Sequence, residues 1–278
     1  MKALKGNVAL LLAAGVCALA AEARSLAYDS IKSDGKWPYH CQGVATDGKS
    51  IYWSFTTVLV KSDLRGKTVD TFRIDRGHMG DLCFHDGRLF VGVNNGSAPD
   101  GTRIGDEVWE FDARTLNRLK VHPTPQTVWC NNGVEWYDGH FWVVCNASQD
   151  CVYNYVFQYT PDFRFKCCRR IASGWTEHGV QAILLAKGKM MFACYGGRDG
   201  AGFDNPCCVF SVDPKVLNSP YKSNERPPIL PILSRVPVNA CEGLLELDGS
   251  IWVVQPLTFR NADGTETCSG NLYRCNDL

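Results

Sequence analysis

The segment HCQGVATDGKSIYWSF, residues 40–55, determines the predicted fold because its pattern returns four more times along the chain. Each copy has polar or glycine-containing leading residues, a short apolar stretch, a turn that usually holds Asp-Gly, and a second apolar stretch. Asp and Gly favour a tight hairpin because this turn needs positive φ angles, which both residues adopt at low cost. The other copies are HMGDLCFHDGRLFVGV at 78–93, CNNGVEWYDGHFWVVC at 130–145, HGVQAILLAKGKMMFAC at 178–194 and CEGLLELDGSIWVVQ at 241–255.

Further strand pairs follow these hairpins in the first four units, and four strands per unit is the composition of a β-propeller blade. The last unit ends at Leu278 without room for a fourth strand, whereas SLAYDSIKS at 25–33 precedes the first unit. We therefore predict an all-β, five-bladed β-propeller closed by the N-terminal strand, since closure removes exposed sheet edges. A β-sandwich with accidental repeats is the alternative.

Residues 1–23 have the composition of a secretory signal peptide. Lys2 and Lys5 precede an apolar run at 8–21, which is too short to span a bilayer as a helix. We expect a secreted or periplasmic protein with a single propeller domain at 24–278 and no stable membrane insertion.

The charge balance and the cysteine content restrict the partners and the redox environment. Basic and acidic residues number 29 each, which argues against nucleic acid as the main partner. The chain has 14 cysteines, a number typical of exported proteins. We expect structural disulfides or buried thiols, and the sequence does not reveal the pairing. Lipidation of Cys17 and a cysteine-bound metal are alternatives, although Val16 and the absence of paired CxxC motifs disfavour them.

The inner strand of each propeller blade lines the central channel, so the leading residues of the five units converge on one channel mouth. Folding alone does not favour polar residues at such positions, because buried polar groups need partners. The convergence therefore predicts a ligand pocket, with a water-filled structural channel as the alternative. The converging residues are Gln42, Asp81 (which follows Gly80), Asn132, Gln181 and Glu242, with His40, His78, Asn131 and His178 beside them.

Within this pocket, the candidate catalytic residues are Glu242, His40 and His178, because a carboxylate and an imidazole can serve as general base and acid. The remaining polar residues are candidate ligand-binding residues: Gln42, His78, Asp81, Asn131, Asn132 and Gln181.

A divalent metal is an open alternative at the same mouth. Zinc accepts imidazole and carboxylate ligands of the kind that His40, His78, His178 and Glu242 offer. Calcium prefers oxygen ligands, which Asp81, Asn132 and Glu242 would supply.

Aromatic residues near the leading segments suggest a sugar-binding surface. Trp37, Trp129 and Trp175 are the candidates for stacking on a sugar ring, because the other tryptophans alternate into the predicted sheets.

The segment at 40–55, followed by LVKSDLRGKTVDTF at 59–72, resembles the opening blade of plant-type and bacterial glutaminyl cyclotransferases, which are five-bladed propellers. The repeat plan is also similar to propellers of the gluconolactonase and senescence-marker type, in which Glu and Asn at the channel mouth hold a divalent metal. This resemblance implies metal-binding or catalytic roles for Glu242 and Asn132. The chain departs from both families in its leading histidines and its cysteine content.

These observations predict an exported propeller that binds a small polar, sugar- or lactone-like molecule at the channel mouth. As an enzyme it would be a hydrolase, a lyase or a cyclase-like acyltransferase. The alternative is a non-catalytic scaffold whose blade faces and loops, at 195–208 and 218–237, contact a protein or polysaccharide. The sequence does not predict the oligomeric state.

Overall fold

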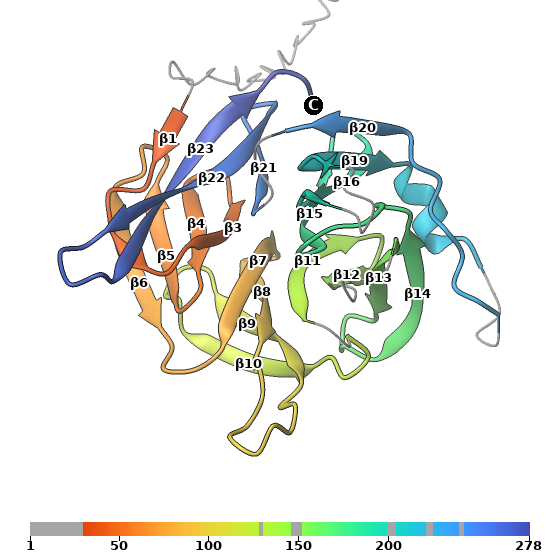
Figure 1. The fold of residues 1–278 in the computed structure, drawn as a ribbon, viewed down its shortest axis with the longest axis horizontal. Helices are drawn as coiled ribbons and strands as arrows, with labels where there is room; N and C mark the ends of the chain where they lie inside the picture. The colour runs from red at the N-terminus through yellow and green to blue at the C-terminus, as the bar shows by residue number, and fades with distance from the viewer. Residues whose placement is uncertain (1–29, 128–129, 146–151, 199–203, 221–224, 239–241) are drawn as a thin grey trace, which may run out of the picture.

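The computed structural model describes residues 30–127, 130–145, 152–198, 204–220, 225–238 and 242–278. Five antiparallel sheets stand around a central axis (Figure 1). The all-β, five-bladed propeller predicted from the repeats is confirmed. The innermost strands are β3 (Cys41–Thr46), β7 (His78–His85), β11 (Asn131–Tyr137), β15 (Val180–Ala186) and β21 (Leu244–Leu247).

The first four blades each continue outward from the inner strand through three more strands. Blade 1 adds β4 (Ser50–Phe55), β5 (Val58–Asp63) and β6 (Thr68–Arg73), and blade 2 adds β8 (Arg88–Asn94), β9 (Asp106–Asp112) and β10 (Arg118–Pro123). Blade 3 adds β12 (His140–Cys145), β13 (Asn154–Tyr159) and β14 (Phe165–Ile171), and blade 4 adds β16 (Lys189–Cys194), β19 (Cys208–Val212) and β20 (Ser234–Pro237). An insertion in blade 4 holds β17 (Gly197–Arg198) and β18 (Asp204–Asn205), and the short 3₁₀ helix η1 (Pro214–Asn218) follows β19.

The inner hairpins turn where the Asp-Gly pattern predicts them. Asp86 and Asp138 have φ angles of 47° and 48°, and the glycine after each has a φ of 74°. Two successive positive φ angles define the tight turn that matches the twist of the flanking strands. The turns of blades 4 and 5 have the same geometry at Lys187-Gly188 and Asp248-Gly249.

Blade 5 takes strands from both ends of the chain. Outside β21 lie β22 (Ser250–Arg260) and β23 (Glu266–Cys275), and β1 (Ser30–Lys32) completes the sheet by pairing with β23. A second short N-terminal strand, β2 (Trp37–Pro38), pairs with the other end of β23. Figure 1 shows β1 and β23 side by side. The predicted closure by the N-terminal strand is therefore confirmed.

The closure is stabilised by an apolar cluster between blades 5 and 1. Ile31 of β1 is 2% exposed and belongs to the same buried cluster as Trp53 of blade 1 and Trp252 of blade 5. Because this cluster contains residues from both ends of the chain, its burial couples the termini to the ring.

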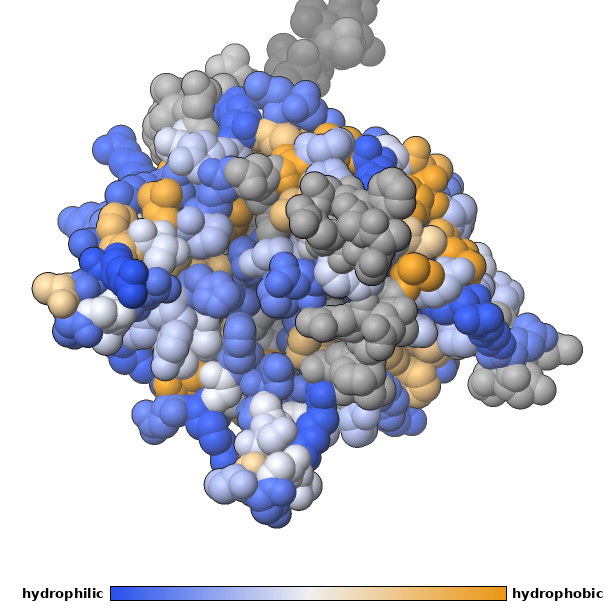
Figure 2. Space-filling model, viewed as in Figure 1, coloured by the Kyte–Doolittle hydropathy of each residue, from blue (hydrophilic) through white to orange (hydrophobic). Residues whose placement is uncertain are grey.

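The surface seen down the axis is mostly hydrophilic (Figure 2). Among the described residues, no helix is long and apolar enough to cross a membrane.

Several cysteines are buried free thiols: Cys41, Cys83, Cys194, Cys208 and Cys268. Burial raises the pKa of each, which keeps it protonated and unreactive. The structure therefore does not show the predicted disulfides at these five positions. The predicted signal peptide, including Cys17, lies outside the described residues.

Ile31→Ala tests the closure. It should lower the free energy of unfolding by about 2–5 kcal/mol, because it leaves a cavity in the cluster that joins blades 5 and 1. Urea denaturation of the purified protein measures the change. Ser30→Ala, on the same strand but at an exposed position, is the control. Equal stability of both variants would show that β1 does not close the ring.

Candidate functional site

β-bulges place the leading polar residues at the channel mouth. The strand ladder skips Gln42 in blade 1, Asn132 in blade 3 and Gln181 in blade 4. In blade 2 it skips both Gly80 and Asp81. A bulge inserts unpaired residues and redirects their side chains. Bulges in four blades therefore direct side chains that are distant in sequence toward the channel mouth.

Glycines next to the polar residues allow the inner strands to approach the axis. A Cβ on Gly43 would lie 2.3 Å from the Cα of Asp81, and one on Gly80 would lie 2.2 Å from the carbonyl oxygen of Asn132. A Cβ on Gly243 would lie 3.1 Å from the Cα of Gly43. The glycines that follow Gln42, Asn132 and Glu242 thus allow the inner strands to lie close together, because a larger residue would push the blades apart.

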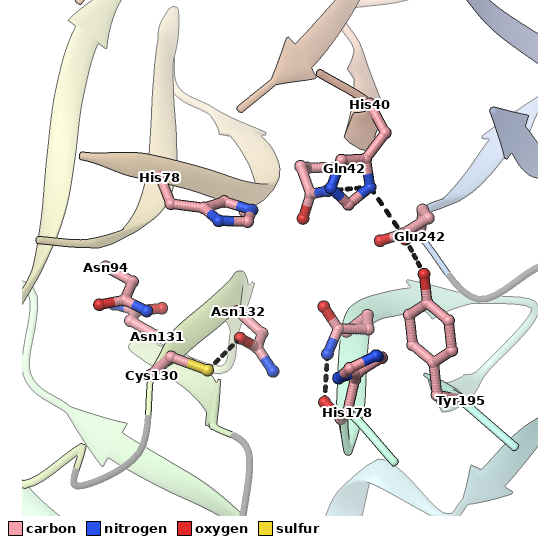
Figure 3. Close-up of a pocket in the computed structure, with 12 residues that line it drawn as sticks. His40, Gln42, His78, Asn94, Cys130, Asn131, Asn132, His178, Tyr195 and Glu242 are labelled. Carbon is pink, nitrogen blue, oxygen red and sulfur yellow. Dashed lines mark hydrogen bonds and ion pairs between the residues drawn. The ribbon is translucent and has the colours of Figure 1, made fainter. Parts of the chain in front are cut away.

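The mouth holds a cavity of about 240 Å³ (Figure 3). Most of the side chains predicted for the site meet there, although they come from five different blades. The lining residues are His40, Gln42, His78, Gly80, Asn94, Cys130, Asn131, Asn132, His178, Gln181, Tyr195 and Glu242.

Asp81 does not line this cavity. Its Oδ1 accepts a hydrogen bond from the Val44 backbone N–H (3.1 Å) and its Oδ2 accepts one from the Ile183 N–H (3.2 Å). The side chain is 1% exposed. Burial raises its pKa well above the ordinary value, and backbone hydrogen bonds oppose that shift. Asp81 therefore contacts the backbone of blades 1 and 4 below the mouth, because Gly80 occupies the equivalent lining position.

Glu242 is the carboxylate of the cavity. It is 2% exposed, and its Oε1 accepts a hydrogen bond from the Tyr195 hydroxyl. The same oxygen lies 3.7 Å from Nδ1 of His40. Its Oε2 is buried and has no hydrogen-bond partner among the described residues. An unsatisfied buried carboxylate oxygen is costly, so a water molecule or a ligand group that donates a hydrogen bond would be stabilised at this position.

The pKa values of two histidines beside Glu242 shift in opposite directions. The neighbouring Glu242 carboxylate raises the pKa of His40 above its ordinary value, against the effect of partial burial. Burial, and then the nearby His40, lowers the pKa of His78. The two ring centroids are 6.0 Å apart. His40 therefore favours the protonated form more than His78 does.

The orientation of the Gln42 amide depends on the protonation of His40. The Nε2 atom of Gln42 lies 2.9 Å from Nδ1 of His40, an arrangement that requires Nδ1 to accept. When His40 gains a proton at Nδ1, Gln42 must present its carbonyl oxygen instead.

The third histidine stands on the opposite side of Tyr195 from Glu242. The rings of His178 and Tyr195 meet edge to face with centroids 5.0 Å apart. The Gln181 amide donates to the His178 backbone carbonyl. His178 is exposed at the rim of the cavity.

The two asparagines of β11 are anchored by their amide nitrogens. Asn131 donates to the Glu107 carbonyl (2.8 Å), and Asn132 donates to the Val180 carbonyl (2.7 Å). Asn132 Oδ1 accepts from the Cys130 thiol. Asn131 Oδ1 is buried without a hydrogen-bond partner among the described residues. Glu242 and Asn131 thus each carry an acceptor oxygen without a hydrogen-bond partner among the described residues, and that of Asn131 lies against Gly92 of β8.

The donor set does not fit a metal ion. Among the residues that the structure describes, no group of three or more His, Cys, Asp or Glu side chains is arranged to hold one. His40 and Glu242 are neighbours, but Asp81 is bound to backbone N–H groups instead of facing the mouth. We therefore derive no chemistry through zinc or calcium.

The opposite end of the channel holds a cavity of about 190 Å³, lined by aliphatic residues of the inner strands together with polar and aromatic ones. Its carboxylates are Glu135 and Glu246. Burial raises the pKa of Glu135 to about 7, while hydrogen bonds from the Leu185 and Trp136 N–H groups oppose the shift. This end lacks the converging amides and imidazoles of the other mouth.

Sequence reasoning missed Tyr195, Asn94 and Cys130. Tyr195 follows the second strand of its blade, and Asn94 ends β8, so the pattern of leading residues does not include them. Of the candidate stacking residues, Trp37 is 9% exposed and packs in the core, Trp175 does not line the cavity, and Trp129 lies outside the described residues.

Comparison with known proteins shows similarity of fold. No known family model matches the chain, and no curated protein matches its sequence. Glutaminyl cyclase from Myxococcus xanthus superposes with a TM-score of 0.51 at 10% identity, over 89% of this chain and 98% of that one. The xyloglucan-locus protein GH43B of Bacteroides ovatus gives 0.54 at 14% identity, over 85% and 56%. YjhT gives 0.50 at 12% identity, over 87% and 96%.

The paired histidines provide a direct test of the site's electrostatics. By NMR, with each signal assigned by substitution, His40 should titrate above 6.5 and His78 below it. Glu242→Gln should lower the pKa of His40, because the amide removes the negative charge that favours the protonated ring. An unchanged His40 titration in Glu242→Gln would contradict the contact between these two side chains.

Proposed function

We propose that this protein binds a small polar, sugar- or lactone-like molecule in the channel-mouth cavity and acts on it with Glu242 as general base. The observation that carries the proposal is the Glu242 carboxylate, which is buried, held through Oε1 by Tyr195 and His40, and unsatisfied at Oε2. A general base needs a free acceptor oxygen in a fixed position within reach of the proton that it removes.

The lining favours a ligand with several hydroxyl or amine donors. The two unsatisfied oxygens, on Glu242 and Asn131, are both acceptors. Around them, His40 and His178 offer groups that can donate when protonated. A ligand that combines hydroxyl donors with an acyl oxygen, as an aldonolactone does, would satisfy both kinds of group.

The acid–base step follows from these positions. Glu242 accepts a proton from water, or from a nucleophilic group of the ligand, as that nucleophile bonds to the acyl carbon. The bond from the acyl carbon to the leaving atom breaks, and that atom takes a proton from His40 or His178. With water the result is hydrolysis, and with an internal nucleophile it is cyclisation. The fold similarity to a glutaminyl cyclase supports including the second outcome.

The signal-peptide pattern supports a place of action outside the cytoplasm. We include secretion or periplasmic location in the proposal on that basis alone.

Glu242→Gln is the decisive variant for this function. The mature protein is incubated with aldonolactones, with sugars and with a glutaminyl peptide, and binding and turnover are followed by NMR. With the compound that is converted, Glu242→Gln should reduce turnover at least about 100-fold, because the amide cannot accept the proton.

Glu246→Gln, at the opposite end of the channel, is the matched control and should leave turnover unchanged. His40→Asn and His178→Asn identify which ring supplies the proton. Binding that is weakened by Glu242→Gln without any turnover would support a non-catalytic ligand-binding propeller. Binding of none of these compounds, or binding unaffected by Glu242→Gln, would overturn the proposal.

A further inference from the structure

A second and larger cavity adjoins the channel mouth. This groove, of about 740 Å³, shares His40, Tyr195 and Glu242 with the central cavity. The three shared side chains therefore stand at the boundary between the two spaces. A group bound to Glu242 in the central cavity can continue into the groove.

The groove is built by an extension of blade 5. β21 has 4 residues, whereas its neighbours β22 and β23 have 11 and 10. The extra length, from Pro256 to Arg260 and from Glu266 to Gly270, projects beyond the blade as a paired hairpin. β2 pairs with this extension through Pro38 and Thr267. The extension is not needed to complete the blade, and it forms one wall of the groove.

Tyr39 forms another part of the wall in an unusual conformation. Its φ angle is 64°, a left-handed value that is rare for a residue with a bulky side chain, and it is 60% exposed. β2 ends at Pro38 and β3 begins at Cys41, so the paired strands on both sides determine the backbone between them. Backbone strain of this kind persists where the surroundings enforce it, and it is concentrated at functional sites. Here it presents an aromatic ring beside His40.

The sizes of the two cavities indicate which part of a ligand each could hold. Sites for small molecules usually measure about 300–1,000 Å³. The central cavity, at about 240 Å³, is below this range, and the groove, at about 740 Å³, is within it. The central cavity suits one small polar unit, and a second unit has room only in the groove.

The lining of the groove favours a sugar ring over a peptide. The ring face of Tyr39 and the hydroxyl groups of Thr258 and Thr265 suit the mixture of C–H and O–H groups on a pyranose. Peptide grooves commonly use main-chain pairing along a strand, but Pro256 has no N–H to offer. Glu266 adds a further acceptor for hydroxyl groups.

We propose that the groove is a second sugar subsite with Tyr39 as its platform, and that the natural ligand is the end of an oligosaccharide. The terminal unit occupies the central cavity and the next unit lies against Tyr39. The inference rests on the proposed function of the channel mouth, and it adds the class of ligand: a chain end of at least two sugar units.

The test compares each disaccharide with its own monosaccharide. Binding of xylose and xylobiose, glucose and cellobiose, and galactose and galactobiose is measured by saturation-transfer NMR and calorimetry. The variants are Tyr39→Asn, Tyr39→Phe and Phe165→Ala. Asparagine accepts the left-handed backbone, so Tyr39→Asn removes the ring with little effect on the chain path. Phe165 is an exposed aromatic residue on the outer strand β14 and provides the control.

We expect at least one disaccharide to bind more tightly than its monosaccharide. Tyr39→Asn should reduce the disaccharide affinity between about two- and tenfold and leave the monosaccharide affinity unchanged. Tyr39→Phe should still bind the disaccharide more tightly than the monosaccharide, and Phe165→Ala should change neither affinity.

Equal binding of both sugars, with no effect of Tyr39→Asn, would overturn the second subsite and leave the channel-mouth proposal intact. Preferential binding of a dipeptide that Tyr39→Asn weakens would also overturn it. Loss of monosaccharide binding in Glu242→Gln, measured alongside, shows separately whether the central cavity binds sugar.

Discussion

The structure depends on one buried carboxylate near the propeller axis. Asp81, on the inner strand of blade 2, accepts hydrogen bonds from the backbone of Val44 in blade 1 and Ile183 in blade 4. Gly43 and Gly133 leave room for it, since a Cβ on either would lie within about 3.0 Å of Asp81. A polar group at this depth is stable only because its oxygens are paired. These bonds link the inner strands of three blades.

The chemistry of the mouth follows from this arrangement. With the inner strands held close, the bulged residues above Asp81 share one small space, and Glu242 is enclosed by Tyr195 and His40. Enclosure leaves one oxygen of Glu242 unsatisfied, and the carboxylate in turn favours the protonated form of His40. The contact between Glu242 and His40 is thus a product of the ring's closure, since the two residues come from opposite ends of the chain. The extended hairpin of blade 5 then adds a groove beside the pair.

Sequence reasoning could predict the blades because their signals are local: alternating apolar residues and Asp-Gly turns. The same repeats place Gln42, Asn132, Gln181 and Glu242 at one level. The repeats align Gly80 with these residues, but they could not predict that its neighbour Asp81 lies below the mouth, because this depends on the bulge in β7. Tyr195 was missed for a related reason: it lies outside the repeated strands and reaches the mouth only through tertiary structure. The cysteine count suggested disulfides, but five buried cysteines are free thiols in the structure. Whether two cysteines pair depends on the tertiary structure that brings them together, which composition does not encode.

The role of Asp81 at the axis can be tested through the stability of Asp81→Asn. The amide keeps the shape of the side chain but replaces one acceptor oxygen with a donor that faces a backbone N–H group. We expect the free energy of unfolding, measured by urea denaturation, to decrease by about 1–3 kcal/mol, with no comparable change for the exposed Asp70→Asn. An Asp81→Asn variant as stable as the unsubstituted protein would show that the axis is held together by something other than this carboxylate.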